Sequence, residues 1–167
     1  AWNRADSSVP KGWLKTWSKA ELAELSSLSW EVDEGFADGS LVDRKMKVIV
    51  DELEKGSGAV LLKGLSMETF GEGALGFDKV RELFAAMVLQ VGTPLSQSAT
   101  GDLMLSVRNE AFGKDDSRTR GPNTNRRLSF HTDRCDVIAF LCLKQARKGG
   151  ENELVRSPAL YEVIRKE

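Results

Sequence analysis

Hydrophobic positions recur at helical intervals in the first half of the chain. In the segment WSKAELAELSSLSW, Ser18 and Glu21 stand at the spacing of a capping box, and leucines follow at every third residue. This pattern predicts a helix over residues 19 to 28. Residues 41 to 55 repeat the helical pattern and stop before Gly56, a residue type that suits the left-handed position after a helix.

A short strand and another helix follow. The run GAVLLKGL, residues 58 to 65, is apolar and bounded by glycines, which predicts a buried strand. The segment FDKVRELFAAMVLQVG, which starts at Phe77, places its aliphatic side chains on one helical face and closes at Gly92 and Pro94. Residues 1 to 94 are therefore expected to be rich in helix.

After Pro94 the pattern changes to short strands, a polar loop and a last helix. The loop EAFGKDDSRTRGPNTN is too long for an ordinary hairpin, so it is expected to be a functional lid or locally disordered. Ser157 as N-cap and Pro158 after it predict the start of a helix. Residues 95 to 167 thus form a strand-rich part, and residues 1 to 167 form one domain. The predicted strands are residues 103 to 109, 127 to 133, 137 to 144 and 152 to 157.

The composition argues against several kinds of partner. Because 24 Lys and Arg face 25 Asp and Glu, for a net charge of -1, nothing indicates binding to nucleic acid or to an anionic membrane. The chain has no long apolar run and no signal-peptide pattern, so we expect a cytoplasmic protein. Cys135 and Cys142 lack the spacing of a disulfide framework or a zinc knuckle and are interpreted as structural, with Cys142 buried in an apolar strand. The oligomeric state is not indicated.

One short motif carries candidate chemistry. The stretch SFHTDRCD contains the chain's one histidine, His131, and Asp133 two positions later. In a strand, residues two apart project to the same face, so both side chains can point into a barrel while Thr132 points away. Two histidines and one carboxylate with open positions are typical of non-haem Fe(II) oxygenases. The motif is short, however, and by spacing alone a structural histidine is the commoner case.

The surrounding block resembles a known family. The segment LSFHTDRCDVIAFLCLKQARKGGENELVRSPALYEVI is similar to the central block of the TauD/TfdA, or clavaminate-synthase-like, Fe(II)/2-oxoglutarate-dependent dioxygenases. In that family a strand with HTD precedes an apolar strand, a Gly-Gly turn, a short strand ending in Ser, and a helix. The part upstream resembles the family more loosely. The resemblance implies an α+β fold in which helices flank a double-stranded β-helix, or jelly roll.

The resemblance also implies a reaction and its site. His131 and Asp133 would be two of three ligands of Fe(II), and 2-oxoglutarate would be the cosubstrate, decarboxylated to succinate while a small organic substrate is oxidised, usually by hydroxylation. After the Gly-Gly turn many relatives have Thr or Ser to bond the cosubstrate. This chain has Asn152, which can donate and accept hydrogen bonds, although packing at a strand edge explains it equally well.

Two residues expected of the family are not found in the sequence. The third ligand, a second histidine, and an arginine that binds the distal carboxylate of 2-oxoglutarate lie farther downstream in the family. We therefore expect a jelly roll truncated before its C-terminal barrel strands, inactive by itself and part of a longer oxygenase. Two alternatives stay open: a non-catalytic, degenerate or truncated relative that acts as an interaction module, and a cupin-like protein that binds another divalent metal.

Four arginines flank the long loop before the motif. They indicate either recognition of an anionic substrate or a solvated loop whose charges are balanced by neighbouring aspartates, and the second interpretation is favoured because charged loops are ordinary. The arginines are Arg118, Arg120, Arg126 and Arg127.

Overall fold

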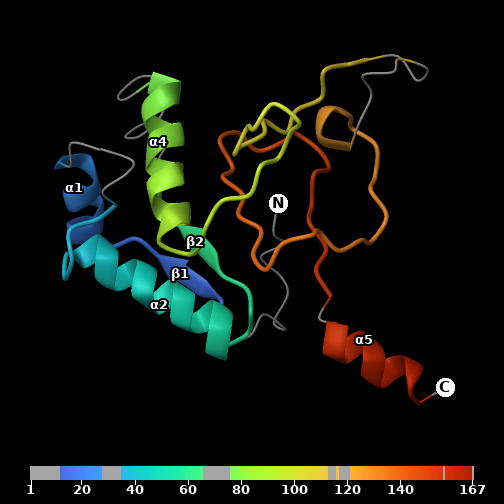
Figure 1. The fold of residues 1–167 in the computed structure, drawn as a ribbon, viewed down its shortest axis with the longest axis horizontal. Helices are drawn as coiled ribbons and strands as arrows, with labels where there is room; N and C mark the ends of the chain where they lie inside the picture. The colour runs from blue at the N-terminus through green and yellow to red at the C-terminus, as the bar shows by residue number, and fades with distance from the viewer. Residues whose placement is uncertain are drawn as a thin grey trace. The chain divides into compact units, whose positions relative to one another are not determined.

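The chain forms two compact units. One includes the described residues from 12 to 143 and the other those from 144 to 166. Figure 1 shows the elements in the order β1, α1, α2, β2, α4, η1 and α5. The computed structural model describes residues 12 to 27, 35 to 65, 76 to 112, 116, 121 to 155 and 157 to 166.

Three helices of the first unit form where the sequence predicts them. They are α1 (Lys19–Ser27), α2 (Leu41–Lys55) and α4 (Gly76–Leu89). The predicted capping box at the start of α1 is confirmed, because the Ser18 N–H donates to Glu21 Oε2 at 2.6 Å and the Glu21 N–H donates to Ser18 Oγ at 3.2 Å. Local capping signals therefore set the start of this helix.

The end of α2 differs from the prediction in one detail. Gly56 has φ -99°, so the expectation of a left-handed residue there is wrong. The left-handed glycine is Gly58, with φ +75°. The N–H groups of Gly56 and Gly58 both donate to the Glu52 carbonyl oxygen, at 3.1 and 3.3 Å. Both bonds satisfy the Glu52 carbonyl in the last turn of the helix, and the left-handed residue comes two positions later than expected.

Two short strands lie beside the helices. Strand β1 (Leu14–Thr16) pairs in parallel with β2 (Leu61–Lys63), with Leu14 opposite Leu61. Strand β2 lies within the predicted strand of residues 58 to 65. Strand β1 was not predicted, because three residues are too few to show a period and its place depends on a partner far along the chain.

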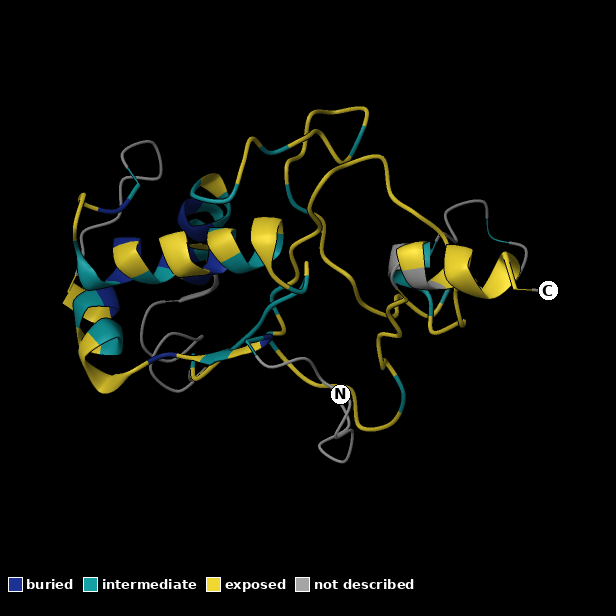
Figure 2. Cartoon of the chain, turned by 90° about the horizontal axis from the view of Figure 1, so that it is seen from below, coloured by how far each residue is buried: buried dark blue, intermediate teal, exposed yellow. Residues whose placement is uncertain are grey.

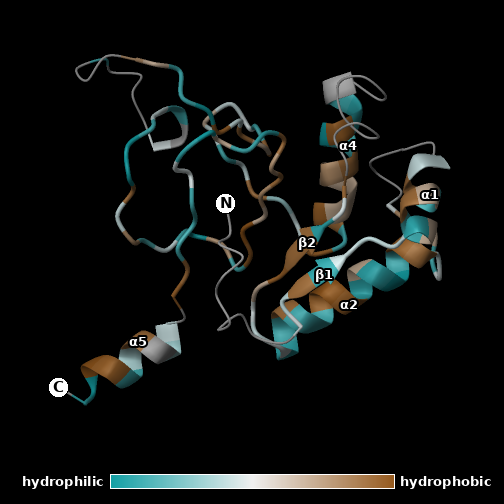
Figure 3. Ribbon diagram, turned by 180° about the vertical axis from the view of Figure 1, so that it is seen from behind, coloured by the Kyte–Doolittle hydropathy of each residue, from teal (hydrophilic) through white to brown (hydrophobic). Residues whose placement is uncertain are grey.

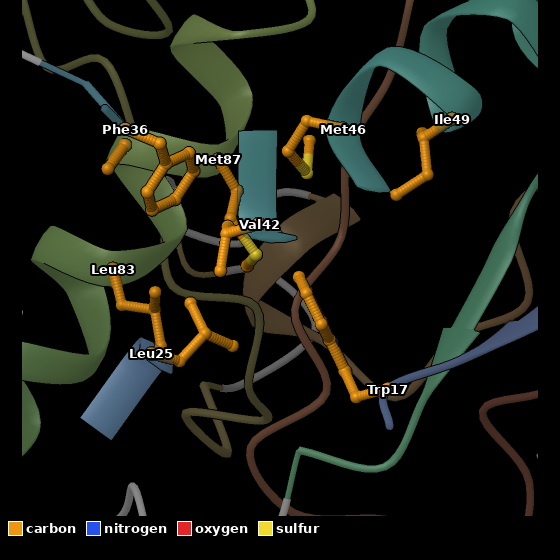
Figure 4. Close-up of a cluster of buried hydrophobic side chains, with 9 residues drawn as sticks. Trp17, Leu25, Phe36, Val42, Met46, Ile49, Leu83 and Met87 are labelled. Atoms are coloured by element: carbon orange, nitrogen blue, oxygen red, sulfur yellow. The ribbon is translucent and has the colours of Figure 1, made fainter. Parts of the chain in front are cut away.

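A cluster of buried side chains holds this region together. Figure 4 shows Leu25 from α1, Val42 from α2 and Leu83 from α4 gathered in it, and among the described residues these are the largest fully buried side chains. The cluster consists of Trp17, Leu25, Phe36, Val42, Met46, Ile49, Leu83, Ala86 and Met87. All of these residues lie between residues 12 and 92, and we call the described residues of that range the helical part.

The N-terminus of α2 is capped by a side chain of α1. The Glu24 carboxylate accepts hydrogen bonds from the backbone N–H groups of Leu41, at 3.0 Å, and Val42, at 2.9 Å. A helix leaves these donors without an intrahelical partner. The hydrogen bond from Val42, together with that from Leu41, holds the pKa of Glu24 below its ordinary value. The Glu24 carboxylate thus satisfies two N–H groups at the start of α2 and links α1 to it, while the N-cap Ser40 Oγ accepts from the Asp43 N–H.

Replacing Glu24 by Gln should lower the stability of the helical part near neutral pH and weaken its dependence on acid. Because folding depresses the pKa of Glu24, its stabilising effect is complete above the ordinary value of 4.5 and is lost as the pH falls through the lower, folded value. Urea unfolding followed by circular dichroism at about pH 7 and about pH 3 measures the effect. The difference between the two pH values should shrink in the variant.

The matched control for this change is Glu54→Gln. Glu54 is an exposed carboxylate on α2, away from the helix start. Its replacement should leave both the stability and the acid dependence close to those of the unchanged chain. Equal losses in the two variants would show that the cap at Leu41 and Val42 has no special effect.

The strands predicted after Pro94 do not form in this structure. The described residues from 95 to 155 contain no strand, and their one regular element is the 3-10 turn η1 (Gly121–Asn123). Large apolar side chains lie at the surface here, among them Phe140, which is 72% exposed. Figure 2 draws most of this segment as exposed, and Figure 3 shows hydrophobic stretches along it. A strand is stabilised by lateral hydrogen bonds and a covered face, and within the described residues these segments have neither.

The exposed surface also corrects one expectation about the cysteines. Cys142 was expected to be buried in an apolar strand, but both Cys142 and Cys135 are exposed. Cys142 is exposed for the same reason that Phe140 is: its burial requires the predicted strand to form and to be covered by a second layer.

The second unit contains α5 (Ser157–Ile164), which begins at the predicted serine. Its apolar side chains, such as Tyr161 and Ile164, are exposed. In the parts of the chain that are described, none of the helices combines the length and the apolar character that a membrane crossing requires.

Candidate metal site

The candidate metal residues lie on an unbent stretch of backbone. The chain bends at Arg126 and again at residues 134 to 136, and between them it runs from Arg127 to Asp133 without a turn or bend. The bend at Arg126 is held by a hydrogen bond from its N–H to Thr124 Oγ1 at 3.1 Å. Side chains two residues apart share a face of an extended chain. No strand is assigned to residues 127 to 133, so the relation between His131 and Asp133 is described by the distance between their side chains.

A backbone carbonyl orients the imidazole. His131 Nδ1 lies 2.8 Å from the carbonyl oxygen of Ser129. Because a carbonyl oxygen can only accept, Nδ1 carries the hydrogen and donates it, and in the neutral ring Nε2 keeps its lone pair. Metal-binding histidines commonly donate their other ring N–H in this way. Sequence analysis assigned no role to Ser129, although it lies two residues before His131.

The free ring nitrogen faces the carboxylate. His131 Nε2 and Asp133 Oδ1 are 3.9 Å apart, and the two side chains are 56% and 49% exposed. Two ligands about 2.1 Å from one ion and about 90° apart around it are separated by ~3 Å, so about 1 Å of side-chain movement would bring both onto a common ion. Exposed side chains can move by this amount at little cost. An imidazole nitrogen and a carboxylate oxygen fit a borderline divalent ion such as Fe(II).

The described residues supply two ligands and no more. Among them, no group of three or more His, Cys, Asp or Glu side chains is placed to hold a metal ion. The structure therefore brings together the two residues that the sequence predicts as ligands and leaves the remaining positions of an ion to other donors. Asn152 lies exposed in the second unit, and its contact with a cosubstrate stays a prediction.

The long loop before the motif is closed at its base. The Glu110 N–H donates to the Asn123 carbonyl oxygen at 3.0 Å, which joins the two ends of the loop. Arg118 and Arg120 fall outside the described residues, so the interpretation of the loop as a lid or a solvated segment rests on the sequence alone. Arg126 is exposed at the bend that follows.

Comparison with known proteins gives a family and one relative. Residues 26 to 167 match the family described as taurine catabolism dioxygenase TauD, TfdA family. FR-33289 synthase from Streptomyces rubellomurinus is 28% identical over 177 residues, which cover 99% of this chain and 51% of the relative. The chain thus spans about half the length of this curated relative. No solved structure matches the chain significantly.

Proposed function

This chain belongs to the TauD/TfdA family, and we propose that it is part of an Fe(II)/2-oxoglutarate-dependent oxygenase that oxidises a small organic substrate by a hydroxylation-type reaction. The family and a relative named as a synthase support an enzyme of the dioxygenase type. One observation carries the proposal at the level of residues. The ring of His131 is oriented through Nδ1 while Nε2 faces the Asp133 carboxylate.

Each residue of the site has a definite task in this proposal. His131 Nε2 and an oxygen of Asp133 would hold Fe(II), and the carbonyl of Ser129 keeps the imidazole hydrogen on Nδ1. Iron held there would supply the activation of oxygen that is coupled to decarboxylation of 2-oxoglutarate to succinate. The Asn152 amide, after the Gly-Gly turn, would donate a hydrogen bond to the cosubstrate.

The proposed enzyme needs further strands outside this chain. We place the second histidine and the arginine for 2-oxoglutarate beyond Glu167, in strands that complete a jelly roll. Two observations support this. The chain spans about half of its relative, and three apolar side chains of a predicted strand, Leu103, Leu105 and Val107, are exposed rather than covered by a second layer. The cytoplasmic location expected from the sequence is part of this proposal.

The coding sequence on both sides of this chain tests the proposal. We expect it to continue past Glu167 into short strands that carry a histidine and an arginine, in a protein of correspondingly larger mass. That protein should form succinate from 2-oxoglutarate only with Fe(II) present. A complete protein without the second histidine, or one that is inactive with Fe(II) and 2-oxoglutarate, would contradict the proposed reaction.

A second function is supported by the two-ligand site and the exposed apolar surface. A degenerate or truncated relative would keep these residues as an interaction module without iron chemistry. The measurable difference from the oxygenase is the affinity for iron. In an interaction module iron should bind weakly, and 2-oxoglutarate should not change that affinity. Fold resemblance does not decide between them, because one fold hosts many functions.

A further inference from the structure

We draw no further inference here: the strongest candidate, the apolar surface patch of the β1–β2 sheet where the half-exposed Leu14 lies opposite Leu61, is an unpartnered face, and nothing among the described residues shows what covers it.

Discussion

Replacing Asp133 by Ala in the full-length enzyme is expected to lower iron-dependent turnover of 2-oxoglutarate by more than about 100-fold. Mutation of a residue that merely hydrogen-bonds to a metal ligand typically costs 10 to 100-fold, roughly, and loss of a ligand itself should cost more. Asp133 is half exposed and packs into no core, so the fold should persist. Succinate formation, measured with saturating Fe(II), reports the loss.

The matched control is Asp136→Ala. Asp136 is an exposed carboxylate three residues beyond Asp133, after the backbone has bent away from the unbent stretch. It carries the same charge and should be dispensable for turnover. Unchanged turnover in Asp133→Ala, or equal losses in both variants, would remove Asp133 from the metal site.

Replacing Leu83 by Ala should destabilise the helical part by about 2 to 5 kcal/mol, the cost of deleting a fully buried aliphatic side chain. Leu83 lies on α4, is 1% exposed and packs in the cluster with Leu25 and Val42. Because small domains are stable by only about 5 to 15 kcal/mol, this loss should visibly shift the unfolding transition. Urea unfolding followed by far-ultraviolet circular dichroism measures it.

The control for this change lies on the same helix. Leu89, at the end of α4, is 39% exposed, and its replacement by Ala should cost less than about 1 kcal/mol. The two variants lose the same atoms from the same helix, so the difference between them isolates burial. Similar losses in both would mean that the cluster around Leu83 does not hold the helical part together.

The sequence predicts the helices well because their signals are local. The capping box of Ser18 and Glu21 fixes the start of α1, and the predicted bounds of α2, residues 41 to 55, are those observed. The cap that Glu24 supplies to α2 could not be predicted, since it joins residues 17 and 18 positions apart. Caps within a helix follow from spacing, and caps between helices follow from packing.

The strands, unlike the helices, could not be predicted from local signals. Strand β1 exists because Leu14 lies beside Leu61, a pairing that no short window of sequence reveals. The segment from residues 103 to 109 has a strand-like composition and forms no strand in this structure. Strand formation depends on partners far along the chain. An alternating sequence therefore shows only that a segment can form a strand, and the strand forms when another layer covers its apolar face.

The candidate metal site could be predicted in part from the sequence. The spacing of His131 and Asp133 predicts that they share a face, and the structure places Nε2 of the one opposite a carboxylate oxygen of the other. The contact between the imidazole and the Ser129 carbonyl depends on how the ring is rotated, and the spacing of residues in the sequence does not predict that rotation. A third ligand cannot be inferred from the chain, because His131 is its one histidine.

Anaerobic titration of the full-length enzyme with Fe(II), with and without 2-oxoglutarate, tests the central claim most directly. If His131 and Asp133 hold iron in a 2-oxoglutarate-dependent site, the cosubstrate should tighten Fe(II) binding, and His131→Ala should abolish both the binding and its dependence on 2-oxoglutarate. Fe(II) binding that ignores 2-oxoglutarate, or that survives in His131→Ala, would contradict the account.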